Sequence, residues 1–173
     1  MQTYIDIAEK NGVVLFDDGS CQFCGASTIK GVHECVEIFN LGFKQLDYAK
    51  EHNHLYRFLS VDAHALQHSE IHGRWSNHFH LTRLHLIFHY KIEWTYSLSP
   101  KLSDHLNVYK KHQPKEFLES PALLHRGNIT TMDILTRSKT ETDCQEMILL
   151  WAKEVYTSWS TYHELVDAIA KGF

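Results

Sequence analysis

The chain has 173 residues, of which 43% are hydrophobic and 22% charged, values that exclude a disordered protein and suit a single domain spanning 1–173. Lys and Arg number 17 against 21 Asp and Glu, and the resulting net charge of −4 argues against a nucleic-acid-binding protein, which needs basic side chains for phosphate contacts. No apolar run reaches the roughly 18–20 residues of a membrane span, and residues 1–16 lack the pattern of a signal peptide, so we expect a cytoplasmic protein that is not held in a membrane.

Residues 1–34 are predicted to form a lead-in that carries a short cysteine-containing segment. Residues 4–8 can form one helical turn that Asn11-Gly12 ends, and residues 13–16 are typical of a strand or a packed extended segment. The motif Cys21-Gln22-Phe23-Cys24-Gly25 then follows a polar turn. Two thiolates in this spacing suit one face of a tetrahedral metal, and glycine permits the turn that closes it, as in a zinc knuckle.

Apolar residues at helical spacing predict an all-α bundle of about four main helices over residues 35–173. The expected ranges are 35–50, 56–68, 78–94 and a last helix of six turns, which Thr140 or Thr142 caps and Gly172 follows. The stretch 97–121 is expected to be mostly connection with one short helix near 103–111. Thr130-Thr131-Met132-Asp133 has the form of an N-cap that opens another short helix.

A single CxxC motif supplies only half of a tetrahedral site. Cys35 lies eleven residues after Cys24, at the expected start of a helix, and is the simplest third ligand, while the fourth could be a His. Two alternatives remain, a reduced pair without a role and a dithiol redox pair. The redox pair normally follows a strand and is followed at once by a helix, a pattern that residues 27–31 do not show.

Histidine is unusually frequent: the chain has 14, and nine of them lie between His52 and His89. His64 and His68 are four residues apart, as are His85 and His89, so each pair shares a helix face and could bind one ion. Any single His in this region is more often a packing residue or an idle surface residue than a ligand. We nevertheless do not expect all nine to be idle.

No GxxxxGK[ST], GxGxxG, HExxH or GxSxG motif occurs in the chain, so the familiar nucleotide-binding and hydrolase signatures are missing. His163-Glu164 is followed by Asp167 where the HExxH motif requires its second His. Asp62 is the one acidic residue in an apolar helical turn. It could orient a metal-binding His, although capping a helix or facing solvent is the more common role.

Three stretches of the chain together resemble a bacterial family of uncharacterised proteins, a domain of unknown function. Members of this family carry a CxxCGA start, a Cys before the first helix, a VDAYAxQHP segment, an HL pair and a WAxxVWxAWxxHH end. The matching parts of this chain are Cys21-x-x-Cys24-Gly25-Ala26, Cys35, Val61-Asp62-Ala63-His64-Ala65-Leu66-Gln67-His68, His80-Leu81 and the stretch 151–163.

Departures from the family pattern help to rank the candidate ligands. His64 stands where the family has Tyr, Ser69 where it has Pro, and Tyr162 replaces the first His of the terminal pair. The resemblance therefore makes His64 a weaker candidate for a metal ligand. It favours the residues that keep the pattern, which are Cys21, Cys24, Cys35, His68, His80 and His163. It implies no particular activity.

Our main hypothesis is a zinc site, mainly structural, formed by Cys21, Cys24, Cys35 and His68, with His80 and His163 as alternative ligands, because sulfur with imidazole favours zinc. The alternative is a hydrolase-like metal enzyme in which His68, His80 and His163 hold a zinc-bound water, with Asp62 or Glu164 as base. A dithiol redox protein is a weaker alternative. The sequence identifies no substrate or partner, and a homo-oligomer is left open.

Overall fold

The computed structural model describes residues 3–112, 121 and 125–173, and within them the chain is all-helical with no strand. The eight α-helices of this part of the chain are α1 (Tyr4–Lys10), α2 (Gly31–Leu41), α3 (His54–Gln67), α4 (Arg74–Phe88), α5 (Leu98–His112), α6 (Thr131–Arg137), α7 (Glu141–Ser158) and α8 (His163–Ala170). The all-α prediction is confirmed, but the helices are more numerous than the four main ones expected. None of the described helices combines the length and apolar character needed to cross a membrane.

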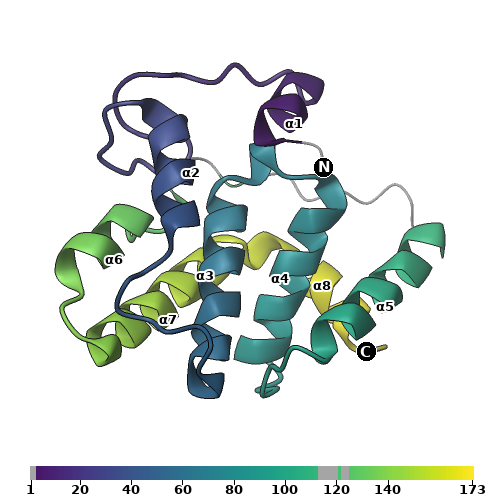
Figure 1. The fold of residues 1–173 in the computed structure, drawn as a ribbon. Helices are drawn as coiled ribbons and strands as arrows, with labels where there is room; N and C mark the ends of the chain where they lie inside the picture. The colour runs from purple at the N-terminus through teal and green to yellow at the C-terminus, as the bar shows by residue number, and fades with distance from the viewer. Residues whose placement is uncertain (1–2, 113–120, 122–124) are drawn as a thin grey trace.

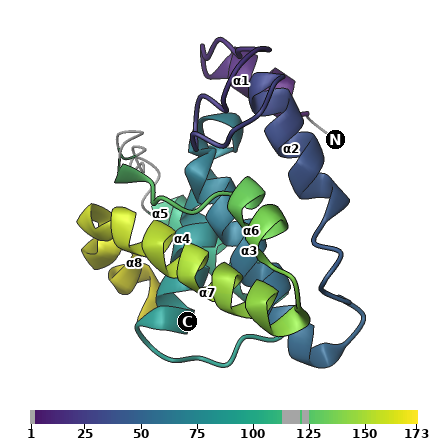
Figure 2. The same ribbon diagram turned by 90° about the vertical axis from the view of Figure 1, so that its left-hand side faces the viewer.

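The main core forms where α7 crosses the antiparallel pair α3 and α4, with α8 packed against α4 (Figures 1 and 2). The side chains that fill it are large, apolar and buried, and come from all four helices: Leu59, Leu66, Leu81, Leu84, Ile148, Trp151, Val155 and Val166. Burial of these side chains removes a large apolar area from water, which is the main stabilising contribution to such a body. The core therefore gives a firm base for the elements packed on its ends.

The first long helix differs from its predicted range of 35–50. It begins at Gly31 and ends at Leu41 because Gly42 adopts a left-handed φ of 72° that cannot continue a helix. Phe43 and Leu46 are nevertheless buried in the main core. Their apolar spacing extends the helical pattern into a turn. The predicted helix therefore continued too far beyond Leu41.

The last predicted helix is broken in two. α7 ends at Ser158, a 3₁₀ turn follows at Ser160–Tyr162, and α8 begins at His163. The Ser158 hydroxyl donates to the carbonyl oxygen of Val155 at 2.6 Å, a side-chain bond that competes with helix continuation. Trp159 at the break and Val166 beyond it are both buried in the main core. The helical spacing of apolar residues therefore continues across the break, and the sequence pattern gave no sign of it. The predicted cap at Thr140 is confirmed, with a reciprocal bond to Asp143.

Other ranges shift by smaller amounts. The helix expected at 56–68 is α3, and the one expected at 78–94 is α4, which begins and ends earlier. α5 is longer than the expected 103–111 because Pro100 lies in its first turn, where proline is tolerated. The rest of that predicted connection, 113–120, lies outside the described residues. The predicted short helices near residues 4–8 and after Thr130 are confirmed as α1 and α6.

The N-terminal segment packs over the adjoining ends of α3 and α4 (Figure 1). Residues 13–16, expected as a strand or extended chain, form no strand, and one isolated bridge joins Gly19 to Lys30. This region has a small buried cluster of its own: Ala8, Cys21, Phe23, Ala26, Val32, Cys35 and Ile71. Two of the cysteines predicted to bind metal, Cys21 and Cys35, thus belong to this small buried cluster.

Candidate metal centre

The Cys21–Gly25 segment forms the tight turn that its sequence predicts. The amide of Gly25 donates to the carbonyl oxygen of Cys21 at 2.9 Å, and the amide of Cys21 donates to the carbonyl oxygen of Ala26 at 2.9 Å. Gly25 has a φ of 74°, in the left-handed region that favours glycine. The turn therefore fixes the backbone on either side of Cys24 and brings the two cysteines of the motif to one place.

Cys35 and His68 join the two sulfurs of the turn from different helices. Cys35 lies in α2, and His68 directly follows the last residue of α3. The ligand atoms of Cys21, Cys24, Cys35 and His68 all lie within 4.8 Å of one another. Three of these side chains are buried and Cys24 is half-buried. The structure thus brings together the four residues of the main hypothesis as a group that could hold a metal ion.

The spacing of these atoms agrees with a tetrahedral site. Metal–sulfur bonds of about 2.3 Å and metal–nitrogen bonds of about 2.0 Å at tetrahedral angles place two sulfurs about 3.8 Å apart and a sulfur and a nitrogen about 3.5 Å apart. The Nε2 atom of His68 lies 3.4 Å from the sulfurs of both Cys21 and Cys35, and the sulfurs of Cys24 and Cys35 lie 3.7 Å apart. A cation at the centre requires little movement of these atoms.

The imidazole of His68 is held in the orientation that a ligand needs. Its Nδ1 lies 2.7 Å from the carbonyl oxygen of His64, to which it donates, so Nε2 points at the sulfurs. The His64 ring is sandwiched, with ring centroids 3.9 Å from Phe39 and 4.0 Å from His68. His64 thus supports the centre through its backbone and its ring. It lies outside the group of four, in agreement with its lower rank among the candidate ligands.

The three sulfurs disfavour one another's ionisation, whereas the imidazole of His68 favours its charged form beside them. Hydrogen bonds from Cys24 and Cys35 hold the pKa of Cys21 far below its usual range, and the pKa of Cys35 is raised far above its usual range by its contacts with the other two sulfurs. Burial lowers the pKa of His68, but the charge on Cys24 and the hydrogen bond to Cys21 outweigh it and raise the value to about 10. One thiolate therefore disfavours ionisation of the next thiol, and a bound divalent cation would offset the repulsion between the thiolates.

Gln67 and Arg126 brace the end of α3 that carries His68. The Gln67 amide donates to the carbonyl oxygens of Arg126 and Ile129 at 3.0 and 2.9 Å and accepts from the Trp151 indole at 3.0 Å. The Arg126 guanidinium donates to the carbonyl oxygen of Gln67 and pairs with Glu70. Sequence reasoning missed both roles. Gln67 lies in the segment that resembles the family, but no local pattern marks Arg126, because Gln67 and Glu70 are far from it in sequence.

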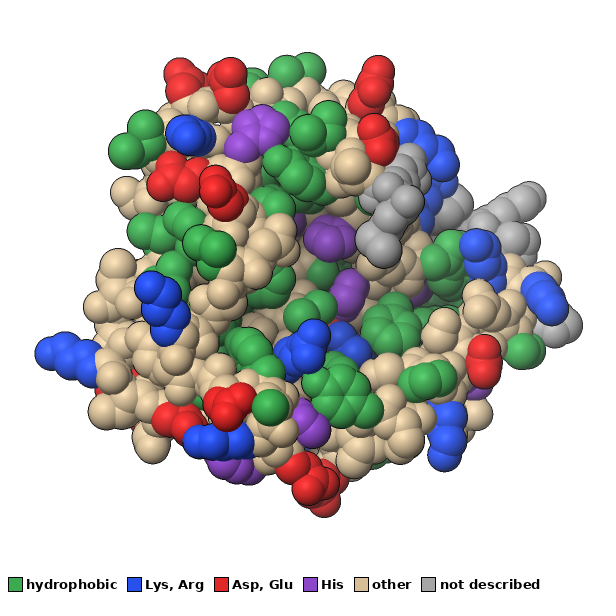
Figure 3. Space-filling model, in the orientation of Figure 1, with side chains coloured by type: hydrophobic (Ala, Val, Ile, Leu, Met, Phe, Trp, Pro, Cys, Tyr) green, Lys and Arg blue, Asp and Glu red, His purple; other side chains and the backbone are tan. Residues whose placement is uncertain are grey.

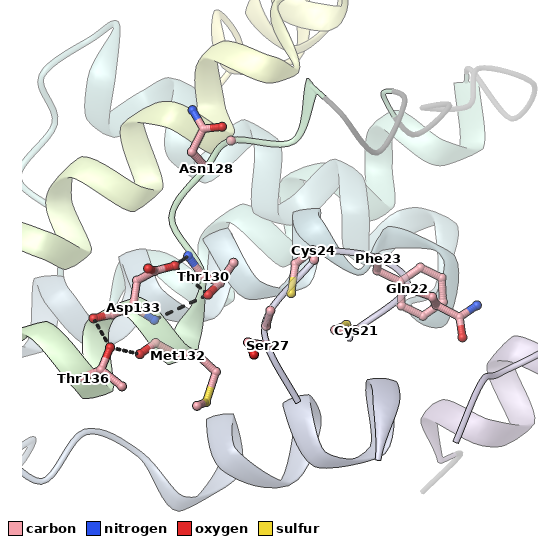
Figure 4. Close-up of a pocket in the computed structure, with 13 residues that line it drawn as sticks. Cys21, Gln22, Phe23, Cys24, Ser27, Asn128, Thr130, Met132, Asp133 and Thr136 are labelled. Carbon is pink, nitrogen blue, oxygen red and sulfur yellow. Dashed lines mark hydrogen bonds between the residues drawn. The ribbon is translucent and has the colours of Figure 1, made fainter. Parts of the chain in front are cut away.

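A pocket of about 710 Å³ borders the centre. Cys24 and Ser27 line it from the cysteine segment, and Thr130, Met132 and Asp133 line it from the start of α6 (Figure 4). Thr130 and Asp133 are already bonded to each other in the capping box that begins α6. Cys21 and Cys24 are therefore the members of the group of four that border this opening, and Cys24 is the half-buried one.

The alternative ligands do not join the group. The Nδ1 of His80 donates to the Oδ1 of Asp62 at 2.6 Å, and Asp62 also accepts from the Arg83 guanidinium at 2.8 Å. His163 lies at the start of α8, with its Nε2 3.0 Å from the carbonyl oxygen of Tyr156, and Glu164 is exposed. Among the described residues, His68, His80 and His163 do not form a three-ligand cluster.

Asp62 has neither of the more common roles considered for it. It lies inside α3 and is fully buried, so it neither caps a helix nor faces solvent, and it orients His80 instead of a member of the cysteine centre. The face built on α3 and α4 is hollowed, and several His side chains gather in the hollow (Figure 3). The histidine-rich stretch therefore contributes one residue to the group of four and places others around it.

Comparison with known proteins gives one match. No curated protein and no solved structure is significantly similar to the chain. Residues 19–160, which include the whole group of four, match a family of unknown function, DUF5946. Since the match covers most of the chain, the protein belongs to the DUF5946 family of unknown function.

Proposed function

We propose that the protein is a zinc-binding protein whose metal centre, formed by Cys21, Cys24, Cys35 and His68, has a mainly structural role. The observation that carries the proposal is the convergence of three sulfurs and one oriented imidazole, all within 4.8 Å, from three segments of the chain. A cation bound there ties the cysteine turn, α2 and the end of α3 together. The protein then serves as a binding or scaffold module.

The donor set favours zinc over other divalent ions. Thiolate with imidazole suits zinc and other soft or borderline metals, whereas magnesium and calcium require oxygen ligands. Four protein donors complete the tetrahedral shell of a structural zinc, which leaves no position for water. The four cysteines of the chain are free thiols. The proposal therefore places the protein in a reducing compartment such as the cytoplasm.

A structural role follows from how little else holds the N-terminal segment. No helix or strand forms between α1 and α2, and the apolar cluster around the sulfurs is small. Short segments with little core are commonly held by a metal, and the free energy of metal binding then contributes to folding. A metal bound at the centre adds a cross-link between this segment and the end of α3.

The enzyme alternative receives less support from the geometry. It requires His68, His80 and His163 around one ion, but His80 is paired with Asp62 and His163 is bonded to the backbone of Tyr156. The dithiol alternative does not account for the third sulfur and the imidazole beside the Cys21–Cys24 pair. A four-donor centre accounts for all four groups.

Metal analysis of purified protein tests the proposal. We expect one zinc per chain in the wild type, and loss of zinc from the double variant Cys21→Ser, Cys24→Ser, which removes two of the four donors. Cys144→Ala is the matched control, because Cys144 is a free buried cysteine in the main core, away from the centre. This control should keep its zinc. A double variant that retains zinc would overturn the proposal.

A further inference from the structure

A second cluster of ligand atoms lies at the other end of α4 from the cysteine centre. His85 and His89 are one turn apart on this part of the chain, and their rings stack with centroids 4.7 Å apart. His85 is buried against α8, whereas His89 is exposed. Two imidazoles four residues apart on a helical turn project to the same side and can bind a single ion.

Asp167 supplies a third donor from α8, which packs against α4 (Figure 1). Its Oδ1 lies 3.4 Å from the Nε2 of His85, and the ligand atoms of His85, His89 and Asp167 all lie within 4.8 Å of one another. Metal bonds of about 2.0–2.2 Å place neighbouring donors about 3–3.5 Å apart. The pair His85 and Asp167 already has this spacing, and the exposed His89 can adjust.

Neighbouring hydroxyls orient two of these donors. The Tyr156 hydroxyl lies 2.9 Å from the Nδ1 of His85, which leaves the Nε2 of that ring directed at Asp167. The Tyr90 hydroxyl donates to the Oδ1 of Asp167 at 2.7 Å. A second hydrogen bond of this kind to a ligand fixes its orientation and is a common feature of metal sites. These contacts come from residues outside the cysteine centre.

We propose that His85, His89 and Asp167 form a second metal site, which binds one exchangeable divalent transition-metal ion. Two imidazoles and one carboxylate suit zinc, nickel, cobalt or copper. Three protein donors leave coordination positions for water or for an exogenous ligand, so this site differs in kind from the closed centre of four donors. The inference goes beyond the proposed structural zinc and does not depend on it.

Lys171 limits the affinity of the second site. Its ammonium lies 2.6 Å from the Oδ2 of Asp167, so it competes with a metal ion for the charge of that carboxylate. The Lys171 side chain is 68% exposed and can move into solvent when a cation binds. His163 is not one of the residues whose ligand atoms converge at this site. We therefore expect a weaker and more readily exchanged ion here than in the cysteine centre.

Titration with Co²⁺ tests the inference, with protein that has been freed of weakly bound metal and carries one zinc per chain. Calorimetry should show one further equivalent bound, and the absorption spectrum should lack thiolate-to-cobalt bands, because no sulfur belongs to the second site. His89→Ala should weaken this binding by at least about tenfold, since the loss of even an outer-shell partner has an effect of that size. His89 is exposed, so this variant is expected to fold.

Two further variants complete the test. Lys171→Met should tighten Co²⁺ binding because it removes the competing charge, whereas the double variant His52→Ala, His125→Ala, which removes two exposed imidazoles elsewhere, should leave it unchanged. The inference is overturned if the zinc-loaded wild type binds no further Co²⁺, or if His89→Ala binds it as well as the wild type does. Thiolate-to-cobalt bands would instead report exchange at the cysteine centre, and they too would contradict a second site as the source of the signal.

Discussion

His68 and His64 show how two neighbouring histidines can have separate roles. The ring of His68 faces the sulfurs, while His64 contributes its carbonyl oxygen and a stacked ring. A backbone oxygen survives substitution of the side chain, whereas an imidazole donor does not. The two residues are one helical turn apart, so substitutions at the two positions disturb the same region of the fold.

His68→Gln should lower the zinc affinity by at least about tenfold, whereas His64→Phe should leave it nearly unchanged. Phenylalanine keeps the stacked ring and the carbonyl oxygen, so the orientation of His68 is preserved. Competition with a zinc-sensitive dye measures both affinities. Equal affinities in the two variants would mean that His68 is not a donor.

Asp62 anchors a buried network that is separate from the cysteine centre. Its carboxylate accepts from Arg83, whose guanidinium lies 4.9 Å from the centroids of both the Phe58 and Phe79 rings. Removal of one member of a buried ion pair leaves the other charge without compensation, with a cost of about 3–5 kcal/mol.

Asp62→Ala should therefore reduce the free energy of unfolding by about 3–5 kcal/mol while the folded protein keeps one zinc per chain. Urea unfolding and metal analysis of the folded fraction measure the two effects. Zinc loss at full stability would indicate that Asp62 acts on a metal, as the enzyme alternative requires.

The cysteines could be predicted from their spacing, because CxxCG encodes a local turn. The choice of His68 from 14 histidines depended on a resemblance, since the contact between α3 and the cysteine segment is not local. The burial of Asp62 could not be predicted. Its partners lie on α4, and a single acidic residue in a helical pattern is usually at the surface.

At the scale of elements, Gly31 controls how α2 presents Cys35. It is the first residue of α2 and has a φ of 55°. A Cβ atom at this position would lie 2.2 Å from the carbonyl oxygen of Phe16. The start of α2 can therefore pack against the N-terminal loop only if this residue has no side chain.

Gly31→Ala should destabilise the protein more than Gly12→Ala. Both glycines have a left-handed φ, which costs an alanine about 1–2 kcal/mol, but a Cβ at Gly12 would meet no atom within 4 Å. The clash at Gly31 should add to that cost and lower the zinc affinity by displacing Cys35. Thermal unfolding and zinc competition measure the difference, and equal effects of the two substitutions would contradict this account of α2.

Apolar periodicity predicted which segments enter the core better than it predicted where helices end. The helices α2 and α7 end at Leu41 and Ser158, yet the spacing of buried apolar residues continues beyond both ends. Helix ends depend on a single backbone conformation or on a competing side-chain bond, whereas periodicity reports only on burial.

At the scale of the whole molecule, the half-buried residue His72 makes stability depend on pH. Burial, together with the nearby His80 and His68, lowers the pKa of His72 from 6.5 to about 3. The unfolded chain therefore binds a proton at this residue in a pH range where the folded chain does not. The stabilisation is fully present above pH 6.5 and decreases as the pH falls toward 3.

His72→Phe should make the protein less sensitive to acid. Between pH 7 and pH 5 the wild type should lose up to about 2 kcal/mol more of its free energy of unfolding than the variant, since one group contributes about 1.4 kcal/mol per pH unit in this range. Urea unfolding at several pH values gives both curves. Parallel curves would show that His72 titrates normally in the folded protein.

The central claim is that three sulfurs and one imidazole bind one zinc ion. X-ray absorption at the zinc edge of the purified protein tests it most directly, because this measurement counts the donor atoms around the metal. We predict three sulfurs at about 2.3 Å and one nitrogen at about 2.0 Å. A zinc surrounded only by nitrogen and oxygen would contradict the account.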